Sequence, residues 1–150
     1  MGYTHYFNFK EKQNMFDEEV LKKLKKVTYC FFNKGIIQAE NDNPEKPVVT
    51  PREIVFNGIG EEGHETFYLT PDTIESNFCK TAHKDYDFPT CVILLILKVH
   101  YQDIFELRSD GFYGELDENW RKAITYVNKL YGETVVSIKD IKDNKVIRIY

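Results

Sequence analysis

A short, uninterrupted apolar run in the second half of the sequence constrains this chain more than any other feature. Cys91–Leu97 reads CVILLIL, and a helix that crosses a bilayer needs about 20 apolar residues, so the run is too short to span a membrane. Because it has no polar face, other elements must cover it on every side, which makes it a core element. Asp87-Phe88-Pro89 is typical of a helix start, with Asp as N-cap and Pro in the first turn. We expect a buried helix that ends near His100, and a buried strand is the alternative.

The whole chain has the composition of one globular domain rather than of a fibrous or disordered protein. Of its 150 residues, 42% are hydrophobic and 29% are charged, and at this length one core suffices. The 15% aromatic share, with 11 Phe and 10 Tyr, can fill a core and leave rings for a binding site. The net charge of -4 disfavours long nucleic acid as a partner, because phosphate binding needs a concentrated basic face.

Cysteine usage and the first residues indicate a reducing compartment. The three cysteines, Cys30, Cys79 and Cys91, are an odd number, and the sequence does not open with a cationic, apolar leader. We therefore expect free thiols, a cytoplasmic location and no membrane partner.

Two further helices are predicted by apolar residues that recur every three or four positions. The first spans about 16 residues and ends at Asn33-Lys34-Gly35, and its apolar face is made by Phe16, Val20, Leu24, Val27 and Phe31. The lysines between them form its solvated face, namely Lys22, Lys23, Lys25 and Lys26. The second begins near Asp117 and ends before Gly132, and its apolar face is made by Trp120, Ile124, Val127 and Tyr131.

Strands are predicted by two-residue alternation and by turn residues between segments. Tyr3–Lys10 alternates, with one face made by Tyr3, His5, Phe7 and Phe9. Arg52–Asn57 and Glu65–Leu69 are expected to form a hairpin around Gly58–His64. The other candidates are Ile36–Ala39, Ile104–Arg108 and a terminal hairpin of Thr134–Ile138 and Val146–Tyr150, with Asn41–Pro47 as a loop. Since strands and helices do not alternate strictly, we expect one α+β domain over residues 1–150, with a mainly antiparallel sheet and about three helices.

Two known motifs are matched only in part. Gly58-Ile59-Gly60-Glu61-Glu62-Gly63 fits the dinucleotide-binding pattern G-x-G-x-x-G, but a strand rather than a helix follows it, and its two glutamates would repel phosphate. We interpret this segment as a hairpin loop. The four histidines lack the spacing of a zinc site and no Cys-x-x-Cys occurs, so we expect no metal and no cofactor.

The densest group of reactive side chains is the segment Phe78–Asp87. Lys80, His83 and Lys84 would lower the pKa of a nearby Cys79 thiol, and the candidate catalytic residues are Cys79, His83 and Asp87. A second interpretation is binding, in which Lys80, Thr81 and Lys84 donate to an anionic group while Tyr68, Phe78 and Tyr86 stack on a planar one. A third is purely structural, with the polar side chains capping the next helix.

Four blocks of the sequence resemble one protein family. They are Gly2-Tyr-Thr-His-Tyr6, Phe56-Asn-Gly58 followed by Glu65-Thr-Phe67, Phe78-Cys-Lys-Thr-Ala82 with Lys84 and Tyr86-Asp87, and Ser109-Asp-Gly111. Together they resemble a family of small, functionally uncharacterised proteins found in bacteriophages, other mobile elements and large DNA viruses, and they span most of the chain. The sequence departs from the family pattern at Asp85, where the family has proline, and at Phe7, where it has tryptophan.

The resemblance implies a setting rather than an activity, because small phage and viral proteins often counter host defence in the host cytosol. We hypothesise a non-catalytic protein that binds a small anionic, nucleotide-like ligand and thereby sequesters an immune signal. The blocks would converge on one polar pocket with aromatic walls, made by Tyr6, Glu65, Phe78, Lys80, Thr81, Lys84, Tyr86 and Asp110. One alternative is a hydrolase or transferase that uses Cys79 or the His83–Asp87 pair. The other is an inhibitor that masks a host protein, with a homo-oligomer as one form.

Overall fold

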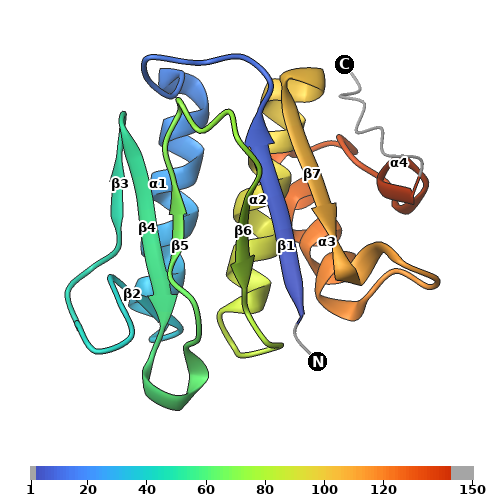
Figure 1. Ribbon diagram of the computed structural model, residues 1–150. Helices are drawn as coiled ribbons and strands as arrows, with labels where there is room; N and C mark the ends of the chain where they lie inside the picture. Colours follow the sequence, from blue (N-terminus) through green and yellow to red (C-terminus); the bar gives the residue numbers. More distant parts are fainter. Residues whose placement is uncertain (1–2, 143–150) are drawn as a thin grey trace.

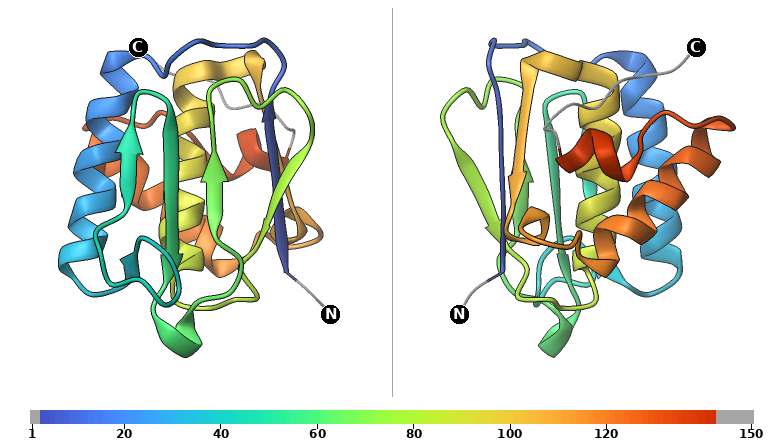
Figure 2. Two further views of the ribbon diagram at one scale, coloured as in Figure 1. Left: turned by 60° about the vertical axis from the view of Figure 1, so that its left-hand side comes forward. Right: turned by 90° about the vertical axis from the view of Figure 1, so that its right-hand side faces the viewer.

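The chain folds into a layer of antiparallel strands and a layer of helices that covers one face of the strands (Figure 1). The computed structural model describes residues 3–142. Two further views show the strands on one side of the molecule and the helices on the other (Figure 2). The expected α+β class is confirmed, and within the described residues all strand pairs are antiparallel.

One of the two sheets has the first strand of the chain at its centre. Its order is β6 (Asn77–Lys80), β1 (Thr4–Phe9) and β7 (Phe105–Ser109). The predicted alternation of β1 is confirmed, because His5, Phe7 and Phe9 are all buried on its inner face. The sequence does not predict β6, since Cys79 is its only buried residue and a single buried position shows no alternation.

The second sheet is built around β4, which pairs with three shorter strands. These are β4 (Glu53–Gly58), β2 (Ile37–Gln38), β3 (Val48–Thr50) and β5 (Phe67–Leu69). The predicted hairpin of β4 and β5 is confirmed. Its loop contains the short helix η1 (Gly60–Glu62), and a strand follows it, so no long helix is available to present backbone N–H groups to a pyrophosphate.

Three long helices form the second layer, and they are α1 (Glu18–Asn33), α2 (Asp87–Tyr101) and α3 (Glu118–Tyr131). The first and third confirm the predicted ranges, and α3 ends at Gly132 in the left-handed conformation that favours glycine. The apolar run belongs to a helix, as expected, and not to a strand. The short helices η2 (Gln102–Ile104) and η3 (Asp110–Phe112) flank β7.

The predicted strand Thr134–Ile138 was wrong, because within residues 3–142 this segment forms no strand and Ile138 begins the short helix α4 (Ile138–Lys142). The reason is a side chain: Asn128 Oδ1 accepts hydrogen bonds from the backbone N–H groups of Val135 and Val136, at 2.8 and 3.1 Å. These donors therefore need no partner strand. The predicted partner, Val146–Tyr150, lies outside the described residues.

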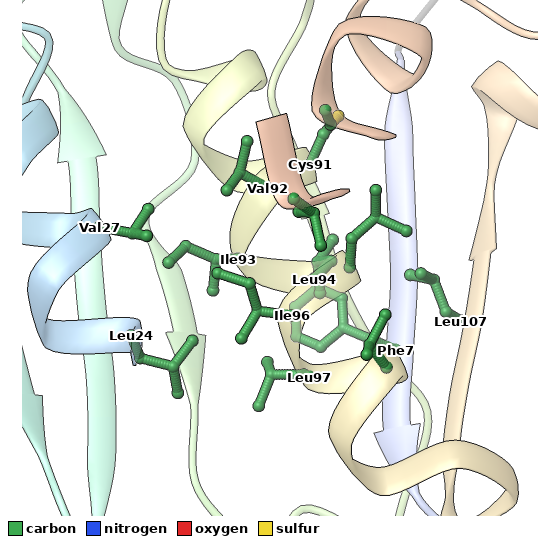
Figure 3. Close-up of a cluster of buried hydrophobic side chains, with 14 of the residues drawn as sticks. Phe7, Leu24, Val27, Cys91, Val92, Ile93, Leu94, Ile96, Leu97 and Leu107 are labelled. Atoms are coloured by element: carbon green, nitrogen blue, oxygen red, sulfur yellow. The ribbon is translucent and has the colours of Figure 1, made fainter. Parts of the chain in front are cut away.

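The helix α2 is the centre of the core, where α1, α3 and the strands surround it (Figure 3). Every side chain of Cys91–Leu97 is fully buried, as a run without a polar face requires. Among the described residues, no helix combines the length and the apolar character needed to cross a membrane. The three cysteines are unpaired, as expected.

We predict that Leu94→Ala lowers the free energy of unfolding by about 2–5 kcal/mol, because it leaves a cavity on the most enclosed helix. Urea denaturation followed by circular dichroism measures the change. Lys25→Ala, on the exposed face of α1, is the control and should change stability by less than about 0.5 kcal/mol. Equal effects of the two substitutions would contradict the central position of α2.

Candidate functional site

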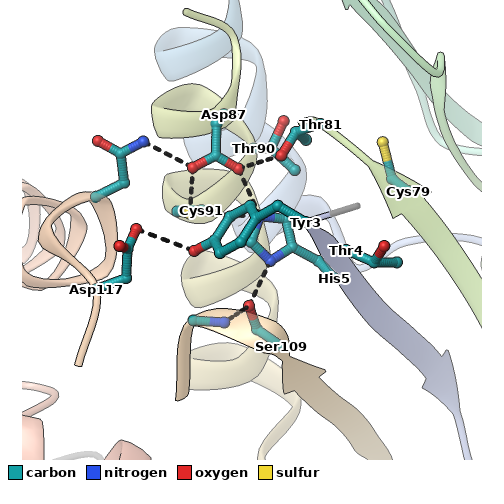
Figure 4. A network of polar contacts seen from close by, with 12 residues as sticks. Tyr3, Thr4, His5, Cys79, Thr81, Asp87, Thr90, Cys91, Ser109 and Asp117 are labelled. Atoms are coloured by element: carbon teal, nitrogen blue, oxygen red, sulfur yellow. Dashed lines mark hydrogen bonds and ion pairs between the residues drawn. The ribbon is translucent and has the colours of Figure 1, made fainter. Parts of the chain in front are cut away.

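Four segments that are distant in the sequence meet around the carboxylate of Asp87 (Figure 4). His5 Nε2 lies 2.6 Å from Asp87 Oδ1, and His5 Nδ1 lies 2.7 Å from Ser109 Oγ. The side chains of His5 and Asp87 are both completely buried. Three of the four blocks that carry the family resemblance therefore converge here, on β1, on the start of α2 and at the end of β7.

The hydrogen bonds around Ser109 define which nitrogen of His5 carries the proton. Ser109 Oγ accepts from Gly111 N and from Trp120 Nε1, each at 3.0 Å, so both of its lone pairs are used. Its own proton must then point to His5 Nδ1. With the Ser109 hydroxyl donating to Nδ1, Nε2 is the ring nitrogen that donates to Asp87. This geometry also requires glycine at position 111, where a Cβ would lie 2.2 Å from Tyr3 Oη.

Asp87 accepts hydrogen bonds from several directions besides that of His5. Thr81 Oγ1 donates to Oδ1, Asn119 Nδ2 donates to Oδ2 at 2.7 Å, and the Cys91 thiol makes a longer contact of 3.8 Å. Burial by itself would raise the pKa of Asp87, but the hydrogen bond and the electrostatic attraction of His5, together with the hydrogen bonds from Thr81 and Asn119, outweigh it, and the pKa lies below its ordinary value. The carboxylate is therefore ionised at neutral pH.

Asp87 does not act as the N-cap that the sequence predicts. The N-cap residue is Tyr86, and the side chain of Asp87, the first helical residue, makes no capping hydrogen bond. The carboxylate points inward instead, because His5 and Thr81 offer it stronger partners than the exposed end of the helix would.

The Ser109, His5 and Asp87 side chains have the order of a catalytic triad, but they stabilise the fold. Ser109 is 3% exposed and His5 is 0% exposed, and the serine oxygen is enclosed by N–H donors. A substrate carbonyl cannot approach it without opening the core. The array instead links β1, β7, α2 and α3 through buried hydrogen bonds.

Cys79 lies inside the sheet and is not an activated thiol. Burial raises its pKa to about 12, against a weaker opposing hydrogen bond with Tyr86, and nearby Glu65 adds to the increase. The expectation that Lys80, His83 and Lys84 would lower this pKa was wrong. The physical reason is that Cys79 is on the buried face of β6, whereas Lys80 is exposed on the opposite face.

Several predicted ligand-binding residues form hydrogen bonds with the backbone. The Tyr86 hydroxyl lies 2.6 Å from the Glu65 carbonyl oxygen, and Tyr86 itself is fully buried. Glu65 Oε1 accepts from Lys80 N at 2.7 Å, and Asp110 Oδ2 accepts from Thr4 N at 3.0 Å. Together with the buried Thr81, these groups join the ends of β1, β6 and β7 to their neighbours.

The other predicted aromatic residues lie on the outer face of the strands, which no helix covers (Figure 1). Tyr6 is directly opposite Phe78 on β6 and Arg108 on β7, and the Arg108 guanidinium lies 5.4 Å from the centre of the Tyr6 ring. Phe78 is 51% exposed, and Tyr68 on β5 is 49% exposed. The structure therefore separates these three rings from Tyr86 and from Lys84.

A surface hollow of about 450 Å³ lies beside the buried array, and its lining residues are Ile36, His83, Lys84, Asp85, Phe88, Asn119 and Lys122. Asn119 connects the two regions, because it lines the hollow and donates to Asp87. His83 and Lys84 are the residues of this lining that the sequence predicts as site residues. Asn119 and Lys122 were missed, because they belong to the exposed side of a helix more than 30 residues further along the chain.

The loop that carries His83 has an unusual backbone. Ala82 and His83 both have positive φ angles, of 52° and 59°, which is uncommon for residues other than glycine. The His83 ring stacks on Tyr3 with ring centres 3.7 Å apart, and the backbone N–H of Thr81 donates to the Tyr3 carbonyl oxygen. These contacts hold the imidazole at the edge of the hollow.

The fold and the site define a small α+β protein with a buried His–Asp–Ser array below an open, partly basic hollow. Comparisons with protein-family models, curated proteins and solved structures found no match for the chain. The shape and chemistry of this hollow are therefore the basis on which a function can be assigned.

We predict that His5→Ala destabilises the protein by about 3–5 kcal/mol, because it leaves the buried Asp87 carboxylate without its closest partner. The double variant His5→Ala/Asp87→Ala should lose less stability than the sum of the two single variants. Chemical denaturation of all four proteins measures this coupling.

The His100–Asp17 pair, 2.8 Å apart with Asp17 58% exposed, is a matched control on the surface. Its coupling should be at most about 1 kcal/mol. If His5→Ala and Asp87→Ala had additive effects on stability, the buried pair would not organise the fold.

We also predict that Cys79 makes stability fall at high pH. The folded protein keeps the thiol protonated up to about pH 12, whereas the ordinary pKa is 9.0, so its contribution is present below pH 9 and is lost as pH rises towards 12. Between pH 9 and pH 10, the free energy of unfolding of Cys79→Ala should fall by about 1 kcal/mol less than that of the wild type. Urea denaturation at each pH tests this, with Val49→Ala as a buried control that keeps the wild-type slope. Identical slopes for Cys79→Ala and wild type would contradict the assignment.

Proposed function

We propose that this protein binds a small anionic, nucleotide-like ligand in the hollow between the Ala82–Lys84 loop and α3. The observation that carries the proposal is the composition of the hollow, where two lysines, Lys84 and Lys122, share one cavity with the ring of Phe88. A cation pair beside an aromatic wall suits a ligand that has an anionic group and a planar group.

The charges near Lys84 and Lys122 favour an anionic ligand over a cationic one. Among residues 3–142, Lys84 forms no ion pair with an acidic side chain, whereas Lys122 lies 3.3 Å from the exposed Glu118. An exposed pair of this kind is weak and can exchange its partner. A phosphate between the two ammonium groups would therefore gain attraction at little cost.

The hollow also has groups that could select the planar part of a ligand. Asn119 is oriented by its hydrogen bond to Asp87, and within the described residues its carbonyl oxygen has no hydrogen-bond donor. A positioned amide beside the apolar side chains of Phe88 and Ile36 suits a heterocycle with a donor at its edge. The volume of about 450 Å³ is within the usual range for small-molecule sites.

The proposed role is binding without catalysis, because His5, Ser109 and Cys79 are each at most 3% exposed and cannot reach a ligand in the hollow. His83 is exposed and lines the hollow, but Asp87, the carboxylate that would orient it as a base, is buried and accepts hydrogen bonds from His5, Thr81 and Asn119. In the phage or viral setting that the sequence resemblance implies, the protein would act by sequestering a nucleotide-derived signal in the host cytosol.

Isothermal titration calorimetry against inorganic phosphate, mononucleotides and cyclic dinucleotides tests this function. We expect binding of at least one nucleotide, and the double variant Lys84→Ala/Lys122→Ala should bind it at least about tenfold more weakly, because two charge-assisted contacts are lost. Lys25→Ala, an exposed lysine on α1, should bind like the wild type. No heat with any of these ligands, or equal affinity of the double variant, would overturn the proposal.

A further inference from the structure

A histidine and two aspartates converge at the inner edge of the hollow. One ring nitrogen of His83 and one carboxylate oxygen from each of Asp87 and Asp117 all lie within 4.8 Å of one another. The three residues come from the loop before α2, from the first turn of α2 and from the N-cap of α3. We propose that they bind a divalent transition-metal cation, of the class of Zn²⁺ or Mn²⁺.

The cluster brings two carboxylates together without a lysine or arginine between them. Two carboxylates at this separation repel each other unless a cation lies between them. Within residues 3–142, no lysine or arginine forms an ion pair with Asp87 or Asp117. The nearest partners are a histidine and a phenol, since His5 Nε2 lies 2.6 Å from Asp87 Oδ1 and Tyr3 Oη donates to Asp117 Oδ2 at 3.0 Å. The space between the carboxylates is therefore suited to a cation.

The three ligand groups are already held in place by neighbouring side chains. Asp87 is fixed by His5, Thr81 and Asn119, and Asp117 is fixed by the Tyr3 hydroxyl at 3.0 Å. The ring of Tyr3 also supports His83 by stacking. Hydrogen bonds of this kind to the ligand side chains are a regular feature of metal sites, because they orient the ligands before the ion arrives.

Each of the three ligand side chains keeps an atom that is available to bind the ion. Among the described residues, neither the ring nitrogens of His83 nor Asp117 Oδ1 has a hydrogen-bond partner. Asp87 Oδ2 accepts one strong bond from Asn119, and its second contact is the long one to the Cys91 thiol. One nitrogen and two oxygens suit Zn²⁺ or Mn²⁺ better than Ca²⁺, which prefers oxygen ligands alone.

The exposure of the site distinguishes it from a neighbouring group of possible ligands. His5, Asp87 and Cys91 also lie close together, but all three are buried, and His5 already uses both ring nitrogens. His83, in contrast, is exposed and lines the hollow. Three protein ligands leave further coordination positions open to water or to an anion in the hollow. The metal site does not depend on the proposed ligand, although an anion bound there would reach the ion.

The test uses Zn²⁺, Mn²⁺ and Co²⁺ alone, added to the full-length protein without any other ligand. We expect one ion per chain by calorimetry, a higher melting temperature with the metal, and visible absorption of bound Co²⁺ that reports its coordination. His83→Ala should weaken binding at least about tenfold and leave the melting temperature without metal close to that of the wild type. Asp117→Asn, which keeps an oxygen for the Tyr3 hydroxyl, should also weaken binding.

The matched control is His64→Ala, which removes an exposed histidine on the β4–β5 loop and should bind metal like the wild type. No binding by the wild type, or equal binding by His83→Ala and His64→Ala, would overturn the metal site. Lys84→Ala/Lys122→Ala should retain the metal affinity of the wild type. Failure of nucleotide binding with intact metal binding would therefore reject only the proposed function, and the reverse result would reject only the metal site.

Discussion

The buried contact between His5 and Asp87 is the interaction on which the rest of this structure depends. An ionised carboxylate in a core is costly unless several donors surround it, and here they come from β1, the turn before α2 and α3. Each donor must therefore be in its native place before the charge is tolerated. The requirement fixes the first strand of the chain against a helix more than 80 residues away.

The same requirement positions the surface groups next to the core. Asn119 reaches from the hollow to Asp87, and Tyr3, which directly precedes β1 and contacts the His5 ring, contacts both Asp117 and His83. Groups at the edge of the hollow are thus linked to the buried array by hydrogen bonds and ring stacking. In the proposed function, this support would lower the entropy cost of binding a ligand.

The periodic elements of this protein could be predicted from the sequence, and the elements without periodicity could not. The helix after Asp87 and the strand that begins the chain are long enough for their buried faces to show a pattern. β6 has a single buried residue, and Thr134–Ile138 has the pattern of a strand, but its Val135 and Val136 N–H groups donate to Asn128 Oδ1. Apolar periodicity does not report that a side chain on the preceding helix binds these backbone groups.

The sequence by itself indicated the α+β class, an almost wholly buried element that is better explained as a helix than as a strand, and a dense group of reactive side chains before it. It did not determine what that segment does, because the chemistry depends on which side chains face each other. Only the tertiary structure decided that Cys79 is buried and that Asp87 pairs with His5 rather than acting as a helix cap. Only the tertiary structure also decided that Lys122 lines the same hollow as His83 and Lys84. Periodicity reports which face of an element is buried, whereas contacts between distant segments are made only when the chain folds.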